Sequence, residues 1–157
     1  MKILIKLKYL GSSFFGFQVQ PDARTVQSTI QDSIESVYKQ RFDVKGCSRT
    51  DSGVHANVYY ATFDTGIDCN INIPTEKIPY ALNSALPNDV SVIDAIIVPD
   101  SFHVRHDVIS KEYEYRIYCG KHKDPLDIKQ LKSCLPAILS PAAFIKSTIW
   151  SVIGKGM

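Results

Sequence analysis

The sequence predicts an α+β domain with a ferredoxin-like (RNP-like) antiparallel sheet and helices on one face. Strand-length segments and amphipathic helical segments follow one another in the order β-α-β-β-α-β, which is the ferredoxin-like pattern. The 157 residues are enough for a domain with its own core. Hydrophobic residues make up 45% and charged residues 22%, as in globular proteins. This arrangement leaves the other face of the sheet open.

The first half of the pattern is a strand, a helix and two further strands. Residues 2–9 alternate between polar and apolar side chains, as a half-buried strand does. Apolar residues recur at helical spacing over residues 26–37, and Thr25 is placed to cap this helix. Residues 43–48 predict a short strand. Residues 57–65 are rich in Val, Tyr, Thr and Phe and predict a clearer one.

The second half of the pattern is a helix and a strand. A helix is expected at about residues 75–85, where Pro79 disfavours the first turn. Residues 89–98 predict the strand that completes the unit.

A second, smaller part of the chain follows. Residues 111–118 alternate strictly and predict a strand, Asp127 can cap a third helix, and residues 148–153 predict a last strand. We therefore expect an N-terminal domain at residues 1–107 and a partial, shortened C-terminal domain at residues 108–157.

Charge, cysteines and apolar runs restrict the function classes. A formal net charge of +2 permits a nucleic-acid partner without requiring one. No apolar run approaches the ~20 residues of a membrane span, and charge interrupts the apolar residues at the start of the chain, so we expect a cytoplasmic protein with no membrane partner. The widely spaced cysteines form no C-x-x-C pair and are expected to be ordinary thiols, with no zinc or redox site. They are Cys47, Cys69, Cys119 and Cys134.

A polar loop between two predicted strands contains Arg49, Asp51 and His55. Loops on a rigid scaffold often carry catalytic groups. A guanidinium two residues from a carboxylate favours the ionised carboxylate, which can act as nucleophile or base. The alternative is a simple turn in which Asp51 caps its own backbone.

The segment at residues 47–56, followed by Phe63-Asp64-Thr65, resembles the signature loop of the TruA family of tRNA pseudouridine synthases, G-R-T-D-x-G-V-H-A and then F-D/E-T. Other segments are similar to family motifs and occur in the family's order. They are residues 9–18, 82–87, 102–105 and 111–118.

The resemblance implies a tRNA pseudouridine synthase, an isomerase that needs no cofactor and no metal. Asp51 would be the nucleophile that attacks a target uridine. Arg49 would occupy the place of the flipped-out nucleotide or contact the backbone beside it. Tyr113 would stack on the uracil near the proton that leaves C5. The family acts on uridines of the tRNA anticodon stem-loop, as homodimers.

The residue chemistry is compatible with this role. A base inside an RNA stem must be extruded before a side chain can reach it, and an aromatic platform such as Tyr113 stabilises the extruded base by roughly 1–3 kcal/mol. The alternative for Tyr113 and Tyr115 is a pair of core aromatics. Arg49 and Arg105 could contact phosphates. One strand face carries the basic residues Lys2, Lys6 and Lys8.

Histidines and phenylalanines give further candidates. His103 and His106 lie three positions apart without a third ligand set, so we do not predict a metal site. His55 and His103 are expected to support the loop or to touch RNA. Phe14 and Phe15 could be exposed RNA contacts or could pack under the first helix, and the sequence does not separate these possibilities.

Beyond Lys121 the resemblance declines, and the chain lacks a match to the family's second half. That half supplies the rest of the tRNA cleft and a basic residue that pairs with the aspartate. We therefore expect an incomplete pseudouridine synthase fold. Three alternatives follow: an active enzyme completed by a partner chain, an inactive RNA-binding or dimerisation module, or a truncated, aggregation-prone product.

Overall fold

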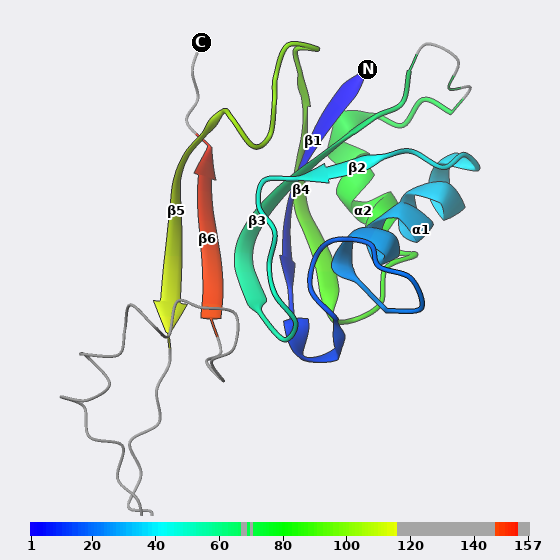
Figure 1. Cartoon of the computed structure of the whole chain (residues 1–157). Coiled ribbons are helices and arrows are strands. Elements are labelled where there is room, and N and C mark those ends of the chain that lie inside the picture. The colour runs from blue at the N-terminus through cyan, green and yellow to red at the C-terminus, as the bar shows by residue number, and fades with distance from the viewer. Residues whose placement is uncertain (67–68, 70, 116–146, 154–157) are drawn as a thin grey trace, which may run out of the picture.

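The computed structural model describes residues 1–66, 69, 71–115 and 147–153 (Figure 1). Within these ranges there are six strands, two α-helices and two short 3-10 helices, η1 at Gly11–Ser13 and η2 at Thr75–Lys77. The strands are β1 Lys2–Tyr9, β2 Val44–Gly46, β3 His55–Asp64, β4 Val90–Val98, β5 Val108–Tyr115 and β6 Ser147–Ile153, and the α-helices are α1 Val26–Tyr38 and α2 Ile78–Asn83. The third predicted helix, which Asp127 would cap, lies outside the described residues, and so do Cys119 and Cys134.

The strands form one sheet in the order β4-β1-β3-β6-β5, with β2 also paired to β3. β1 pairs antiparallel with both β3 and β4. β2 pairs antiparallel with the end of β3 near Phe63, so the order β4-β1-β3-β2 confirms the predicted ferredoxin-like α+β fold. β6 runs parallel to the start of β3, near His55, on the edge that β1 leaves available. This parallel pairing departs from an all-antiparallel sheet.

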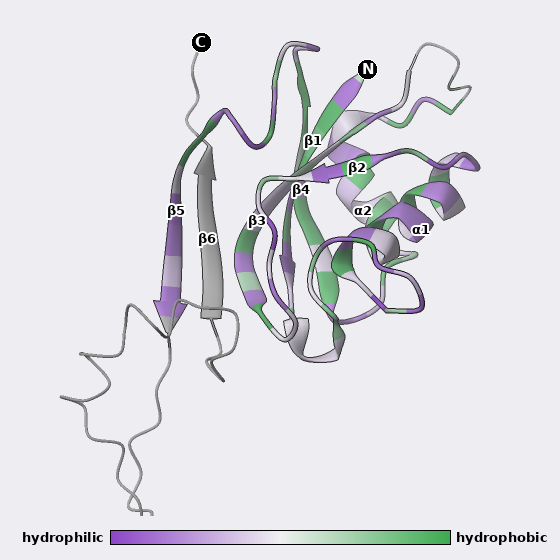
Figure 2. Ribbon diagram, viewed as in Figure 1, coloured by the Kyte–Doolittle hydropathy of each residue, from purple (hydrophilic) through white to green (hydrophobic). Residues whose placement is uncertain are grey.

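Both helices cover one face of the sheet, and the core lies between the helices and that face (Figures 1 and 2). Thr25 and Ser28 form a capping box at the start of α1, which confirms the predicted cap. The rings of Tyr38 in α1 and Phe63 in β3 pack with their centroids 5.8 Å apart, so alternate residues of β1 and β3 face the helices. The buried side chains on this face include Ile3, Ile5, Leu7, Tyr59 and Phe63.

The second helical segment is shorter than predicted. Residues 75–77 form a 3-10 turn, and α2 begins only at Ile78. Pro79 lies at the start of α2. Backbone N–H groups in the first turn have no acceptor within the helix, so a proline there costs no helical hydrogen bond. No helix in the described ranges is long and apolar enough to cross a membrane.

The face away from the helices is less open than the sequence predicts. Residues 99–107, here called the crossing segment, connect β4 to β5. Lys2, on that face, donates from Nζ to the main-chain oxygens of Asp100 and Phe102, and Arg105 donates from Nε to the Gly46 oxygen of β2 (3.3 Å). Val104 is buried. The crossing segment therefore covers part of the face, and Lys2 anchors it instead of belonging to a free basic surface.

Candidate active site

The loop between β2 and β3 is held by a second loop that follows β1. We call residues 49–54 the aspartate loop and residues 10–17 the cradle. The Phe17 amide donates to the Thr50 oxygen (3.0 Å), and the Gly53 amide donates to the Phe14 oxygen (3.2 Å). The Ser52 hydroxyl donates to the same Phe14 oxygen (3.2 Å). These bonds tie the aspartate loop to the cradle at three residues, two of them through the main chain.

Two buried tyrosines support the loop from below. The Tyr9 hydroxyl lies 2.9 Å from Oγ1 of Thr50, and the Tyr59 hydroxyl donates to the main-chain oxygen of Ser48. Burial raises the pKa of both phenols, so they stay protonated and neutral near neutral pH. The start of the aspartate loop is therefore tied to β1 and β3.

The close approach of cradle and loop requires glycine at two positions. A Cβ at Gly11 would lie 1.9 Å from the Val54 main-chain oxygen, and a Cβ at Gly16 would lie 2.7 Å from the Thr50 oxygen. Gly16 also has φ +93°, a conformation that other residues rarely adopt.

The side chain of Asp51 is exposed to solvent on this fixed backbone. Among the described residues its carboxylate makes no hydrogen bond and no ion pair. The turn is closed by the Val54 amide, which donates to the main-chain oxygen of Asp51 (3.3 Å), so the side chain does not cap the backbone. Arg49 and Asp51 are both exposed and form no ion pair with each other.

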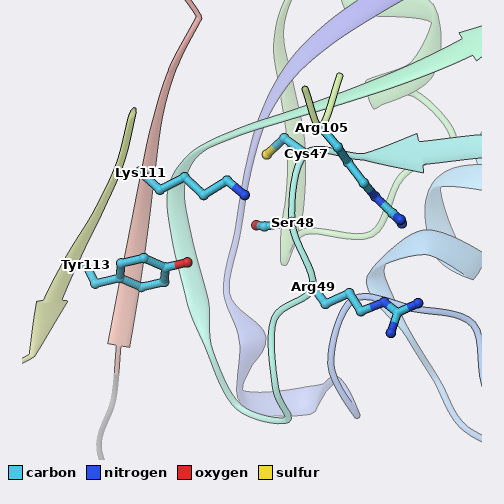
Figure 3. Close-up of a pocket in the computed structure, with 6 residues that line it drawn as sticks. All are labelled: Cys47, Ser48, Arg49, Arg105, Lys111 and Tyr113. Atoms are coloured by element: carbon cyan, nitrogen blue, oxygen red, sulfur yellow. The ribbon is translucent and has the colours of Figure 1, made fainter. Parts of the chain in front are cut away.

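A pocket of about 370 Å³ lies beside this loop (Figure 3). Lys111 and Tyr113 extend from β5 toward the chain that follows β2, and Arg49 and Arg105 lie on the opposite side. The lining residues are Cys47, Ser48, Arg49, Arg105, Lys111 and Tyr113. The pocket therefore combines three cationic side chains with one aromatic ring.

The structure brings three of the predicted site residues together in this pocket, namely Arg49, Arg105 and Tyr113. Tyr113 is 47% exposed, which excludes the alternative of a core aromatic for this residue. Asp51 does not line the pocket but follows Arg49 by two positions. His55 accepts a hydrogen bond at Nδ1 from the Gly11 amide (3.3 Å), a position that suits loop support.

The remaining candidates lie at the edges of the site. Nδ1 of the exposed His103 accepts from the Arg105 amide (3.3 Å), and its ring lies 4.2 Å from that of His106. Within the described ranges no three metal-ligating side chains cluster. Phe14 is 2% exposed and Phe15 is 61% exposed, so the ring of Phe14 is placed for loop support and only Phe15 can meet a partner.

Comparison with known proteins gives a family match across this part of the chain. A family model described as tRNA pseudouridine synthase matches residues 6–107, which include the cradle, the aspartate loop and the crossing segment. The chain belongs to the tRNA pseudouridine synthase family.

Relatives in the family include proteins from two staphylococci. The chain is 45% identical over 124 residues to tRNA pseudouridine synthase A of Staphylococcus carnosus (strain TM300), covering 79% of this chain and 45% of that protein. It is 39% identical over 139 residues to tRNA pseudouridine synthase A of Staphylococcus aureus (strain Newman), covering 88% of this chain and 50% of that protein. The chain thus spans about half the length of these relatives.

Sequence reasoning about this family member missed three lining residues, Cys47, Ser48 and Lys111. Lys111 could have been found, because residues two apart on a strand share a face and Tyr113 was already a candidate. Cys47 was expected to be an ordinary thiol. It is buried, and no sequence pattern marks its place at the pocket.

Proposed function

We propose that this chain carries the uridine-isomerising centre of a tRNA pseudouridine synthase, acting on the anticodon stem-loop with Asp51 as nucleophile. Family membership supports the reaction class. The observation that carries the proposal is the pocket of three cations and Tyr113 beside an exposed carboxylate on a fixed backbone. A carboxylate without an internal partner is available to an incoming substrate.

The proposed reaction is an isomerisation without net gain or loss of atoms. Asp51 attacks C1′ of the flipped-out uridine, and the bond between C1′ and N1 breaks. The uracil turns, a bond forms between C1′ and C5, and the bond between C1′ and the Asp51 carboxylate breaks. The C5 proton then leaves, and N1 ends with a proton. None of these steps requires a metal or a cofactor.

The pocket residues would position the nucleotide. Tyr113 would stack on the uracil, and Arg49, Arg105 and Lys111 would contact phosphates, the usual source of affinity for RNA. Arg105 is held for this by its bond to Gly46. A cavity of about 370 Å³ is within the size range of small-ligand sites.

A second candidate is an RNA-binding or dimerisation module without turnover. It is favoured by the cationic lining of the pocket, which suits RNA whether or not turnover follows. Both candidate functions include a homodimer. Light scattering of the chain at several concentrations tests whether it forms.

The deciding experiment maps pseudouridine in unmodified tRNA after incubation with the chain. We expect product at a uridine of the anticodon stem-loop. Absence of product, together with tRNA binding that weakens as salt rises, would overturn the enzyme in favour of the binding module. Product at a uridine outside the anticodon stem-loop would overturn only the proposed target.

Lys111→Gln is expected to lower tRNA affinity by about fivefold at constant salt, because one phosphate contact is lost. The slope of log affinity against log salt should decrease in magnitude by about 1. Lys77→Gln, at an exposed position of η2, removes the same charge away from the pocket and should leave both quantities unchanged. Equal effects of the two substitutions would contradict a phosphate contact at Lys111.

Tyr113→Ala is expected to reduce single-turnover product formation by roughly a hundredfold or more, because the platform at the reacting base is lost. Affinity for tRNA should fall by only about fivefold, the equivalent of about 1 kcal/mol of stacking. Tyr113→Phe keeps the ring and should retain most of the affinity. Equal losses of turnover and affinity in Tyr113→Ala would count against its place at the base.

A further inference from the structure

An ion pair on the far side of the cradle joins the segment before α1 to the start of β4. Nη1 and Nη2 of Arg24 donate to the two carboxylate oxygens of Asp89 at 2.7 and 2.9 Å. This two-bond geometry is the most directional form of a salt bridge. The guanidinium carbon also lies 4.1 Å from the centre of the Phe14 ring, which is a cation–π contact.

Phe14 contacts both Arg24 of this ion pair and the aspartate loop. Its ring is 2% exposed and lies under Arg24. Its main-chain oxygen accepts from both the Ser52 hydroxyl and the Gly53 amide, each at 3.2 Å. Any movement of Phe14 would therefore displace the two residues that follow Asp51.

The main chains of Arg24 and Asp89 hold the cradle as well. The Phe15 amide donates to the Arg24 oxygen (2.9 Å), and the Leu10 amide donates to the Asp89 oxygen (2.8 Å). The ion pair thus joins two residues that bind the cradle on either side of Phe14. Closing the pair fixes the path of the chain from Leu10 to Phe15.

We propose that Arg24, held by Asp89, is a positioning residue for Asp51. It touches neither the pocket nor the carboxylate, and acts through Phe14 on the backbone of Ser52 and Gly53. The catalytic consequence rests on the proposed function. The structural consequence, a more rigid aspartate loop, does not.

The effect is expected to be local. Arg24 is 41% and Asp89 23% exposed, and pairs at such positions contribute little to the free energy of global unfolding. Local opening of a loop is a separate equilibrium, and exchange of its amide hydrogens reports it. The Gly53 amide, which donates to Phe14, is the natural probe, and the Thr65 amide, which donates to Met1, is a reference outside the loop.

The test compares Arg24→Gln with Arg41→Gln by hydrogen exchange of the whole chain. Arg41 is a matched control, since it also forms exposed ion pairs, with Asp32 and Glu35, away from the loop. We expect exchange at Gly53 to become about threefold to tenfold faster in Arg24→Gln, with Thr65 unchanged. Arg41→Gln should leave both amides unchanged. Arg24→Lys keeps a cation over Phe14 and should restore part of the protection.

Unchanged exchange at Gly53 in folded Arg24→Gln would overturn the proposal, and so would an equal increase at Gly53 and Thr65, which indicates global destabilisation. With an active wild-type chain, kcat should fall about threefold to tenfold at nearly constant KM; a fall confined to affinity would overturn the positioning role. A wild-type chain without product would overturn the proposed function, and the exchange result would still decide whether Arg24 positions the loop.

Discussion

Asp51→Asn is expected to abolish pseudouridine formation while the chain stays folded and still binds tRNA. The amide has nearly the same shape as the carboxylate but is not a nucleophile under these conditions, so a loss of at least roughly a thousandfold is expected. The side chain is exposed and makes no hydrogen bond within the described residues. Its replacement therefore leaves no buried group unpaired and should change the free energy of unfolding by less than about 0.5 kcal/mol.

The measurement is single-turnover product formation, with thermal unfolding and tRNA binding recorded on the same preparation. Asp43→Asn is the matched control, because Asp43 is also exposed and lies at the far end of β2. It should have wild-type rates. Product at a comparable rate from Asp51→Asn would remove Asp51 from the role of nucleophile and leave the pocket as an RNA contact only.

Local sequence patterns predicted most of the elements because their causes are local. The polar–apolar alternation of residues 2–9 became β1, in which Ile3, Ile5, Leu7 and Tyr9 are buried and only Leu4 of the other face is buried as well. Thr25 caps α1 through its own hydroxyl, a bond that depends on residues three apart. The motif that carries Asp51 could be found for the same reason, since all of it lies in one loop.

Contacts between distant segments could not be predicted in the same way. The crossing segment covers part of the open face because Val104 is buried there and Lys2 bonds to its main chain, and residues near 2 and 102 show no shared pattern. The parallel partner of β3 is equally non-local. Even Arg49 and Asp51, two positions apart, do not pair, because side-chain direction in a loop depends on the cradle beneath it.

The carboxylate of Asp51 has no partner in the described part of the chain, while the backbone that carries it is fixed. Main-chain bonds from the cradle hold the Thr50 and Gly53 positions on either side of it, and buried phenols hold the chain before it. The loop is already ordered when the protein folds, so its conformational entropy is not lost again when the substrate binds. By the same reasoning, a substitution at the closest contact between cradle and loop should disturb the position of Asp51 most.

That contact is at Gly11, and Gly11→Ala is expected to lower the free energy of unfolding by about 3 kcal/mol. The added Cβ would lie 1.9 Å from the Val54 oxygen, so the cradle or the loop must move. Because Val54 closes the turn onto Asp51, product formation should be lost even where the protein is still folded. Urea unfolding gives the stability, and a single-turnover assay at low temperature gives the activity of the folded fraction.

Gly66→Ala separates this steric effect from the general cost of replacing a glycine. Gly66 has φ +65° with nothing within 4 Å of an added Cβ, so alanine there meets only backbone strain of about 1–2 kcal/mol and lies outside the aspartate loop. Activity per folded molecule should therefore survive in Gly66→Ala and disappear in Gly11→Ala. If Gly11→Ala retained both stability and turnover, the close packing of cradle against loop could not be what positions Asp51.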